Sequence, residues 1–256
     1  MHPEIPRTLY QTWDSVDTIP LGARAAQQTW RIKNPGWEFA FFDEVGRRNT
    51  VSKFGDDAIR AYDRLDRIAF KADLWRYCQL YLDGGIYADI DSECLVPFDD
   101  TLSEAATFVA SAATPRTNGG LTWAVFQAFI AVTPRHPFLK AAIDRGIREI
   151  LGGEPDGFTS IGPSGLGMAI NMARGRKLRA PNPAGQDGET LLLKKQGQTL
   201  SISGTAIINC QYDGYKAELR ASGKDHWRDQ NTRVSFRRRF TRRIRRLIFP
   251  RSGGLG

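Results

Sequence analysis

The chain has 256 residues, of which 41% are hydrophobic and 11% aromatic, enough to bury one sizeable core, so we expect one main domain. No run of about 18 apolar residues exists, which argues against a membrane-spanning helix. The first residues lack a basic segment followed by an apolar one, so we expect no signal peptide. The three cysteines fit neither a zinc pattern nor a disulfide framework, which favours a reducing, cytoplasmic compartment.

The net charge of +8 comes from one segment near the C-terminus. Residues 237–251, RRRFTRRIRRLIFPR, carry eight arginines and no acid. Without these eight, the chain has 28 basic and 28 acidic residues, so the body is formally neutral. We therefore expect no nucleic acid as the main partner of the body.

The first half alternates strand-like runs with helical patterns. We expect strands at 7–13, 37–43 and 86–90, and helices at 21–34 and 66–82. The helix over 66–82 is the clearest, because its apolar residues form a single stripe that ends at Gly84 and Gly85. This alternation predicts an α/β fold with a mostly parallel central sheet.

The second half continues with strands and helices in alternation. We expect strands at 107–111, 122–132, 190–194, 198–202 and 205–209, a helix at 137–151, a Gly/Pro turn that leads into a helix over 160–174, and a loop at 179–189. His136 fits a turn residue next to a helix N-terminus. The body is expected to end near residue 230, which gives a domain over 1–230 and a basic tail over 231–256.

Two aspartates, Asp89 and Asp91, stand at the end of an apolar run. On an extended segment, residues at i and i+2 point to the same side, so the two carboxylates can converge on one hard cation such as Mg²⁺ or Mn²⁺. Taken alone, the pair also fits two solvated turn acids. Asp73 and Arg76 share one side of the preceding helix, either as an intrahelical ion pair or as part of the same cleft.

Residues 70–91, FKADLWRYCQLYLDGGIYADID, resemble the sugar-binding region of glycosyltransferases that contain an Asp-x-Asp motif. That family includes initiating mannosyltransferases (glycosyltransferase family 32), bacterial capsular-polysaccharide transferases and clostridial glucosylating toxins. Its signature positions are filled by Ala72, Asp73, Arg76, Tyr77, Leu80, Tyr81, Gly84, Gly85, Tyr87, Asp89 and Asp91. Looser matches are IPRTLYQTW, where Tyr10 replaces the family's histidine, FQAFIAVTPRHPFL, SIGPSGLG and KDHWRDQ.

The resemblance implies a GT-A-like nucleotide-sugar-binding fold and a metal-dependent transfer that retains the anomeric configuration. It assigns Asp89 and Asp91, with Asp91 acting more directly, to catalysis and to a Mn²⁺ (or Mg²⁺) ion on the donor's diphosphate. It assigns donor binding to Trp13, Asp73, Arg76, Tyr87, Gly84, Gly85 and Trp227, and a further metal contact to His226. The two glycines also fit a simple helix stop.

The resemblance further implies a UDP- or GDP-sugar donor and a glycan or lipid-linked acceptor. We interpret the protein as a transferase of bacterial capsular or cell-surface polysaccharide synthesis, located in the cytoplasm at the inner face of the cell membrane. The alternatives are a toxin-like transferase that glycosylates a protein side chain, a catalytically silent nucleotide-sugar-binding protein, and an RNA-binding protein.

The basic tail has the pattern of an amphipathic helix, with a stripe of phenylalanine, isoleucine and leucine residues from 236 to 248 and arginines on the other faces. Such a helix is typical of segments that lie on an anionic membrane surface. A solvated tail, a tail that docks on the body, and RNA binding are the alternatives.

Overall fold

The computed structural model describes residues 4–99, 101, 106–112, 120–153 and 157–221. The chain divides into two compact units, Met1–Asp213 and Gly214–Gly256. The first unit holds the whole β-sheet, and the described part of the second holds helix α8 (Tyr215–Ala221). The expected boundary near residue 230 and the basic tail over 231–256 lie outside the described residues and stay predictions.

The sheet contains ten strands in the described residues. They are β1 (Thr8–Thr12), β2 (Glu38–Phe42), β3 (Gly85–Ala88), β4 (Glu93–Cys94), β5 (Phe108–Ala112), β6 (Val125–Val132), β7 (Gly185–Asp187), β8 (Thr190–Gln196), β9 (Thr199–Ile202) and β10 (Thr205–Asn209). Their order is β2-β1-β3-β6-β5-β8-β9-β10-β4, and β7 pairs with β8. All the strands predicted from the sequence form, with slightly shifted ends, whereas β7 lies in a segment that was expected to be a loop.

The strand directions correct one expectation. β2, β1, β3, β5 and β8 run the same way, but β6 lies antiparallel between β3 and β5. β9, β10 and β4 extend the sheet by antiparallel pairing. The fold is α/β as predicted, but the sheet is mixed and not mostly parallel.

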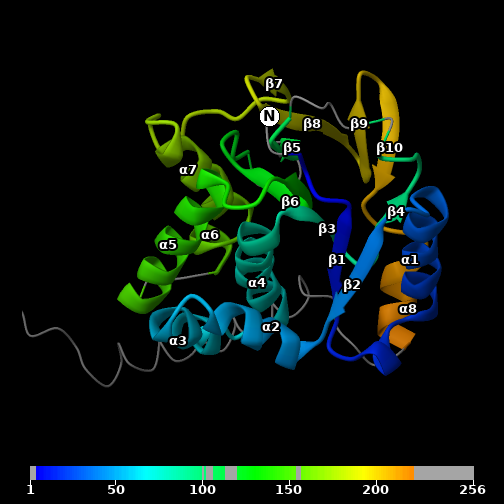
Figure 1. Cartoon of the computed structure of the whole chain (residues 1–256), viewed down its shortest axis with the longest axis horizontal. Helices are drawn as coiled ribbons and strands as arrows, with labels where there is room; N and C mark the ends of the chain where they lie inside the picture. Colours follow the sequence, from blue (N-terminus) through cyan, green and yellow to red (C-terminus); the bar gives the residue numbers. More distant parts are fainter. Residues whose placement is uncertain (1–3, 100, 102–105, 113–119, 154–156, 222–256) are drawn as a thin grey trace, which may run out of the picture. The chain divides into compact units, whose positions relative to one another are not determined.

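The helices of the first unit are α1 (Leu21–Lys33), α2 (Glu44–Ser52), α3 (Asp56–Arg64), α4 (Ile68–Asp83), α5 (Pro137–Gly152), α6 (Gly157–Ser160) and α7 (Pro163–Ala173), with a 3-10 turn η1 (Val16–Thr18). The predicted helices correspond to α1, α4, α5 and α7, whereas α2 and α3 were not expected. In Figure 1, α2 to α7 lie to one side of β3 and β6, and α1 lies beside β4.

Both faces of the sheet are covered. One apolar cluster joins α2, α3, α4, α5 and α7 to the sheet through residues such as Trp75, Phe108 and Ile130. The other includes Trp30 of α1 and Phe129 of β6, together with residues of β9 and β10. Alternate residues of one strand serve opposite faces, as side-chain alternation requires. Polar functional residues are therefore left to the two edges where strands begin or end.

The edge where β1, β2 and β3 end is called here the carboxyl edge. Trp13 follows β1 and Asp89 follows β3, and the register of Tyr10 with Tyr87 brings these two chain positions side by side. The opposite edge, where β3, β5 and β8 begin, is called the amino edge. In open α/β sheets ligands bind at the carboxyl ends of the strands, which makes the carboxyl edge the first place to look for a site.

Gly84 and Gly85 join α4 to β3 at the amino edge. Their φ angles are +66° and +94°, values that residues other than glycine rarely adopt. A Cβ atom on Gly84 would lie 2.7 Å from Pro134 and 2.9 Å from Pro6, and one on Gly85 would lie 2.7 Å from the carbonyl oxygen of Thr8. Both glycines are therefore required by the turn itself.

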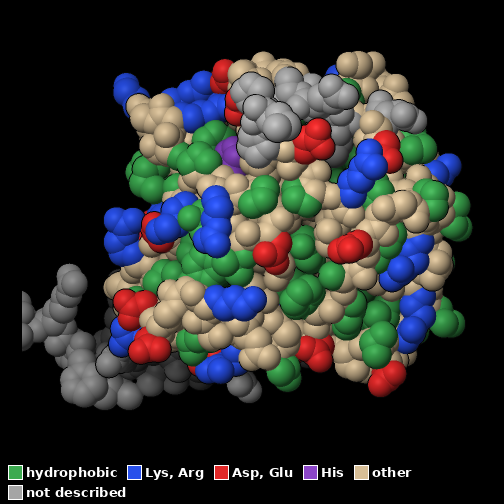
Figure 2. Space-filling model, in the orientation of Figure 1, with side chains coloured by type: hydrophobic (Ala, Val, Ile, Leu, Met, Phe, Trp, Pro, Cys, Tyr) green, Lys and Arg blue, Asp and Glu red, His purple; other side chains and the backbone are tan. Residues whose placement is uncertain are grey.

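Within the described residues, no helix is both long and apolar enough to cross a bilayer. Cys78, Cys94 and Cys210 are buried free thiols. On the face shown in Figure 2, acidic and basic side chains are interspersed over most of the surface, which agrees with the formal neutrality of the body.

Candidate active site

The central polar group of the carboxyl edge comes from helix α4. Asp73 and Arg76 lie one turn apart, and Arg76 Nη2 lies 3.0 Å from Asp73 Oδ1. Both residues are buried, with 6% and 5% of their surface exposed. Arg76 also donates from Nη1 to the carbonyl oxygen of Gln127 on β6 at 2.6 Å. The pair predicted from the sequence is therefore a buried ion pair and not a solvated one.

Arg76 connects this pair to the acidic segment. Its Nη2 lies 3.5 Å from Asp89 Oδ1, and its guanidinium carbon stands 4.0 Å from the centre of the Tyr87 ring. Tyr87 donates from its hydroxyl to Asp89 Oδ1 at 2.7 Å. Asp73, Arg76, Tyr87 and Asp89 thus form one connected cluster, as the sequence predicted. The Asp89 side chain is 35% exposed, so the cluster opens towards solvent there.

The backbone around the two acidic residues differs from the expected strand. β3 ends at Ala88, and residues 89–92 form a turn in which Ser92 donates both its backbone N–H and its hydroxyl to the carbonyl oxygen of Asp89. The assumption of an extended segment through Asp91 was therefore wrong. The strand ends there because the Asp89 carbonyl accepts these turn bonds and, at 3.5 Å, the amide of Gln11 from β1.

Asp91 is nevertheless held beside Asp89. Its carbonyl oxygen accepts from the backbone N–H of Tyr212, and its Oδ2 accepts from Gln211 Nε2 at 3.3 Å. Burial, and then the negative charge of Asp89, raise the pKa of Asp91 to about 7. Two carboxylates that repel each other in this way would be stabilised by a cation between them.

The α4 carboxyl group is perturbed in the same direction. Burial, and to a lesser degree the charge of Asp89, raise the pKa of Asp73 to about 7 against the opposing effect of Arg76. Burial alone would lower the pKa of Arg76, but Tyr87, Asp73 and Asp89 outweigh it and raise that pKa. Clustered, perturbed titratable groups in one place are a recognised mark of functional sites.

Trp13 stands next to this cluster at the end of β1. Its indole nitrogen donates to the carbonyl oxygen of Thr18, and its own carbonyl oxygen accepts from Arg47 Nη1 at 3.0 Å. Arg47 is fully buried and also binds the hydroxyl of Thr12 and the carboxylate of Glu44. The unexpected helix α2 thereby fixes the backbone that carries Trp13.

Other predicted site residues are not brought to the carboxyl edge. Gly84 and Gly85 lie at the other end of β3, about 13 Å along the strand from Asp89 by its rise per residue. Their geometry accounts for them as turn residues. His226 and Trp227 lie outside the described residues.

A divalent cation fits the acidic turn. Among the described residues no group of three or more His, Cys, Asp or Glu side chains could hold a metal. Mg²⁺ and Mn²⁺ sites need fewer protein ligands, because one or two carboxylates complete their shell with water and substrate phosphates. Asp89 and Asp91, neighbouring hard oxygen ligands of which one shows a raised pKa, are the residues that would hold such an ion.

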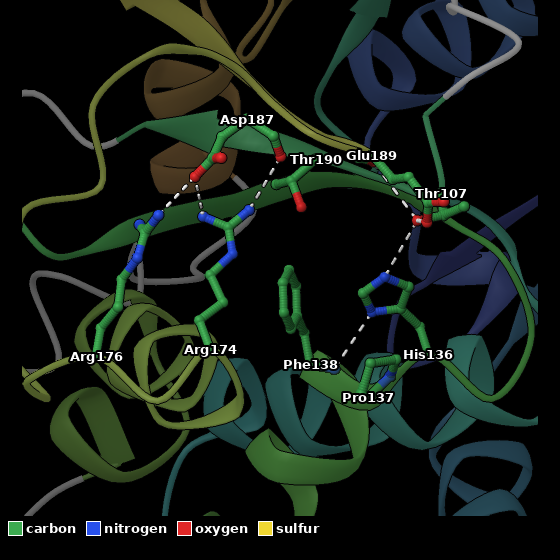
Figure 3. A pocket seen from close by; sticks show the side chains of 9 residues that line it. All are labelled: Thr107, His136, Pro137, Phe138, Arg174, Arg176, Asp187, Glu189 and Thr190. Atoms are coloured by element: carbon green, nitrogen blue, oxygen red, sulfur yellow. Dashed lines mark hydrogen bonds and ion pairs between the residues drawn. The ribbon is translucent and has the colours of Figure 1, made fainter.

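A separate hollow lies at the amino edge. An open pocket of about 500 Å³ is lined by Thr107, His136, Pro137, Phe138, Arg174, Arg176, Asp187, Glu189 and Thr190 (Figure 3). Both arginines pair with Asp187, at 2.8 and 2.6 Å. His136 caps α5 by accepting from the backbone N–H of Phe138, as its predicted turn position implied, and burial lowers its pKa to about 4. Asp187 is paired with both arginines, which sets this pocket apart from the acidic cluster.

Comparison with known proteins supports the acidic cluster as the functional region. Residues 20–108 match the family model described as "Glycosyltransferase sugar-binding region containing DXD motif". The resemblance to the DXD glycosyltransferases is confirmed. The matched region contains α1, α2, α3, α4 and β3, and thus every residue of the cluster around Arg76.

Two relatives show how much of this chain is similar to named mannosyltransferases. An initiation-specific alpha-1,6-mannosyltransferase of Schizosaccharomyces pombe is 34% identical over 96 residues, 36% of this chain and 24% of that protein. Inositol phosphoceramide mannosyltransferase 1 of the same organism is 29% identical over 143 residues, 55% of this chain and 42% of that protein. The chain thus spans less than half the length of either relative.

The solved structure "PaToxG Glycosyltransferase" superposes with a TM-score of 0.55. The match covers 67% of this chain and 71% of that one, at 18% sequence identity. At this identity the likeness shows a shared α/β glycosyltransferase-like fold.

Sequence reasoning assigned no role to three glutamines around the DXD region. Gln11, Gln127 and Gln211 contact the carbonyl of Asp89, the Asp73–Arg76 pair and the carboxylate of Asp91. They come from β1, β6 and the segment after β10, so no local spacing connects them to the motif. The one sequence feature that they share is a position within an apolar strand or just after its end.

Proposed function

We propose that the protein is a metal-dependent, retaining glycosyltransferase that moves a sugar from a nucleotide-sugar donor to a glycan or lipid-linked acceptor. The observation that carries the proposal is the convergence of the Asp73 and Asp89 carboxylates on the guanidinium of Arg76 at the carboxyl edge. The match of residues 20–108 to the sugar-binding region of DXD glycosyltransferases supports it.

Each residue of the cluster has a chemical task in this proposal. Ionised Asp73 is an acceptor for hydroxyl groups of the donor sugar, because a carboxylate accepts hydrogen bonds and donates none. Arg76 presents positive charge between Asp73 and Asp89, where the sugar meets the diphosphate. Tyr87 orients Asp89 through its hydroxyl. Trp13 offers an aromatic surface for the nucleotide base next to them.

The reaction breaks the bond between the anomeric carbon and a diphosphate oxygen, and the electron pair leaves with that oxygen. The acceptor hydroxyl forms the new glycosidic bond and gives its proton to the departing diphosphate oxygen. A bound divalent cation would neutralise the charge that develops on the departing diphosphate. Asp89 and Asp91 serve by presenting their carboxylates from a turn that Ser92, Gln11 and Gln211 hold in place.

A mannosyl donor ranks first among the candidates. Both relatives described above are named as mannosyltransferases, and residues 20–108 of this chain match the sugar-binding region of DXD glycosyltransferases. The sugar pocket of a transferase is built around hydroxyl groups, and a site that bonds a particular hydroxyl discriminates strongly against its absence. The donor panel below therefore includes GDP-mannose next to other GDP- and UDP-sugars.

The proposal also includes a cellular location and a pathway. We place the protein in the cytoplasm at the inner face of the cell membrane, acting in capsular or cell-surface polysaccharide synthesis. The arginine-rich tail over 231–256 would bind the anionic lipid surface there. Binding of the full chain to anionic and to neutral vesicles, with and without residues 233–256, tests this part, and equal binding by both forms would contradict it.

The central experiment measures binding and turnover of a panel of GDP- and UDP-sugars by the full chain with Mn²⁺, with Mg²⁺ and with a chelator. We expect one donor to bind and to be hydrolysed or transferred only when a divalent ion is present. Product anomers, read by NMR, test retention. If no nucleotide sugar binds in the presence of Mn²⁺, the proposal is wrong.

A further inference from the structure

Gln127 is a buried amide that the DXD motif does not include. It lies on β6, which is separated from α4 by about 50 residues of sequence, and only 5% of its surface is exposed. Its backbone carbonyl accepts from Arg76 Nη1 at 2.6 Å. Hydrogen bonding by its side chain lowers the pKa of Asp73, against the effect of burial. One residue of a different strand thus touches both members of the α4 pair.

The orientation of the Gln127 amide is set from behind by Tyr77. The Tyr77 hydroxyl donates to Gln127 Oε1, and it also lies 2.5 Å from the carbonyl oxygen of Ile161. Tyr77 is fully buried, so its one hydroxyl hydrogen is shared between these two oxygens and is not given to bulk water. With Oε1 facing Tyr77, the NH₂ group of Gln127 is the part that faces Asp73. An amide nitrogen is a donor only, and it is therefore matched to a carboxylate.

The side chain and the backbone of Gln127 act on different partners. Replacing the side chain removes the bond to Asp73 but leaves the backbone bond to Arg76 in place. The side chain's effect is therefore confined to the position and hydrogen bonding of the Asp73 carboxylate. Asp73 is the residue that would meet the donor sugar, whereas Asp89 and Asp91 would meet the diphosphate.

We propose that Gln127 is a positioning residue that fixes the Asp73 carboxylate for the hydroxyl groups of the donor sugar. The inference rests on the function proposed above. It states that Gln127 contributes to recognition of the sugar and not of the nucleotide. Tyr77 completes the arrangement by holding the amide in the orientation that donates to Asp73.

The test compares two ligands on the same variants, by calorimetry on the full chain with Mn²⁺. One ligand is the nucleotide sugar that binds the wild type best in the donor panel, and the other is its nucleoside diphosphate without the sugar. For Gln127→Met we expect about tenfold weaker binding of the nucleotide sugar, the usual size of one lost bond to a charged group. Binding of the nucleoside diphosphate should stay within about twofold.

Two further substitutions distinguish positioning from packing. Gln127→Glu keeps the shape but puts a second acid against Asp73, so it should weaken nucleotide-sugar binding more than Gln127→Met does. A role in packing alone predicts the reverse order. In an Asp73→Asn background, Gln127→Met should have little further effect, because both act on the same contact.

Gln79→Met is the matched control. Gln79 is equally buried on α4, and its amide likewise donates to a carboxylate, Asp83 Oδ2 at 2.6 Å, but at the end of the helix away from Asp89. Its replacement should leave the affinities for both ligands unchanged. If Gln127→Met does not fold, Tyr77→Phe removes the anchoring hydroxyl alone and should weaken nucleotide-sugar binding a few-fold with the same selectivity.

The possible failures are distinguishable. If the wild type binds neither ligand, the proposed function is wrong and the inference falls with it. If the wild type binds both, but Gln127→Met weakens both equally or neither, the proposed function stands and the role of Gln127 is refuted. Additive losses in the Asp73→Asn background would also refute it.

Discussion

The two edges of the sheet hold the same kinds of side chain in opposite electrostatic states. At the carboxyl edge, burial raises the pKa of Asp73 and Asp91 to about 7, and a single arginine stands between Asp73 and Asp89. At the amino edge, Arg176 and Arg174 lower the pKa of Asp187, which is mostly exposed. The carboxyl edge has more carboxylates than arginines, whereas at the amino edge Asp187 is paired with two arginines.

This difference shows why a hollow alone is a poor guide to function. The pocket of Figure 3 is a clear hollow, but its two arginines are already paired with Asp187. The acidic cluster holds a carboxylate with a strongly raised pKa next to a second carboxylate. Burial and repulsion destabilise the ionised form of these carboxylates, so a cation that binds between them gains the free energy of removing that repulsion.

The largest expected effect is on activity. Asp91→Ala should lower kcat/KM of metal-dependent transfer by about 10²- to 10³-fold, because it removes a carboxylate that would hold the cation on the leaving diphosphate. Asp187→Ala at the amino edge should change it by less than about twofold. Steady-state kinetics over a Mn²⁺ titration measures both. A larger loss in Asp187→Ala would reverse the comparison of the two edges.

The next expected effect is on stability. Arg76→Met leaves Asp73 buried without its cation and should lower the free energy of unfolding by about 3–5 kcal/mol. Arg174→Met breaks a pair whose acid is 59% exposed and should cost at most about 1 kcal/mol. Urea unfolding followed by circular dichroism compares the two variants. Equal losses would show that the two arginines are buried to the same effective degree.

A smaller change tests the glycine turn. Gly84→Ala adds a side chain at φ +66° against two prolines and should cost about 2–4 kcal/mol of stability. Gly188→Ala, at φ +59° but with no atom within 4 Å of the added Cβ, should cost about 1–2 kcal/mol. The KM of the remaining folded Gly84→Ala enzyme for its donor should be unchanged. An increased KM would restore the donor-binding role that the resemblance assigned to Gly84.

A further expected effect is a pH dependence of stability. The pKa of Asp73 and of Asp91 is raised from 3.8 to about 7, so the folded state keeps protons that the unfolded state has lost. Their contribution to stability is therefore fully present below about pH 4 and is lost as the pH rises to about 7. Asp91→Asn should flatten this decline relative to the wild type. Asp187, whose pKa is lowered, contributes stability above about pH 4 that is lost in acid, so Asp187→Asn should leave the neutral decline unchanged.

The sequence predicted those parts of the fold that local patterns determine. The stripe on α4, the stop at Gly84 and Gly85, and the cluster of Asp73, Arg76 and Asp89 all follow from spacing within about 20 residues. Helix α2 was missed because its sequence, EVGRRNTVS, has no apolar stripe and includes Gly46, Asn49 and Thr50, which are poor helix formers. Asp43, whose side chain accepts from the N–H of Gly46, was the one usable signal.

Tertiary contacts determined the rest. The direction of β6 depends on the connection from β5, because two buried strands read alike whether they pair parallel or antiparallel. The end of β3 at Ala88 depends on bonds from Ser92 and Gln11 to Asp89. The amides of Gln127 and Gln211 reach the site from distant strands, so a motif read along the chain cannot include them.

The stacking of Arg76 on Tyr87 has a consequence for the thermodynamics of binding. An arginine side chain in water samples many rotamers, and restricting them costs roughly 2 kcal/mol of entropy. In this protein the ring of Tyr87, the carbonyl of Gln127 and two carboxylates already immobilise the guanidinium. That loss of freedom occurs when the chain folds, so a ligand that reaches Arg76 meets a preorganised cation, and its association should show a smaller entropic penalty than binding to a surface arginine would.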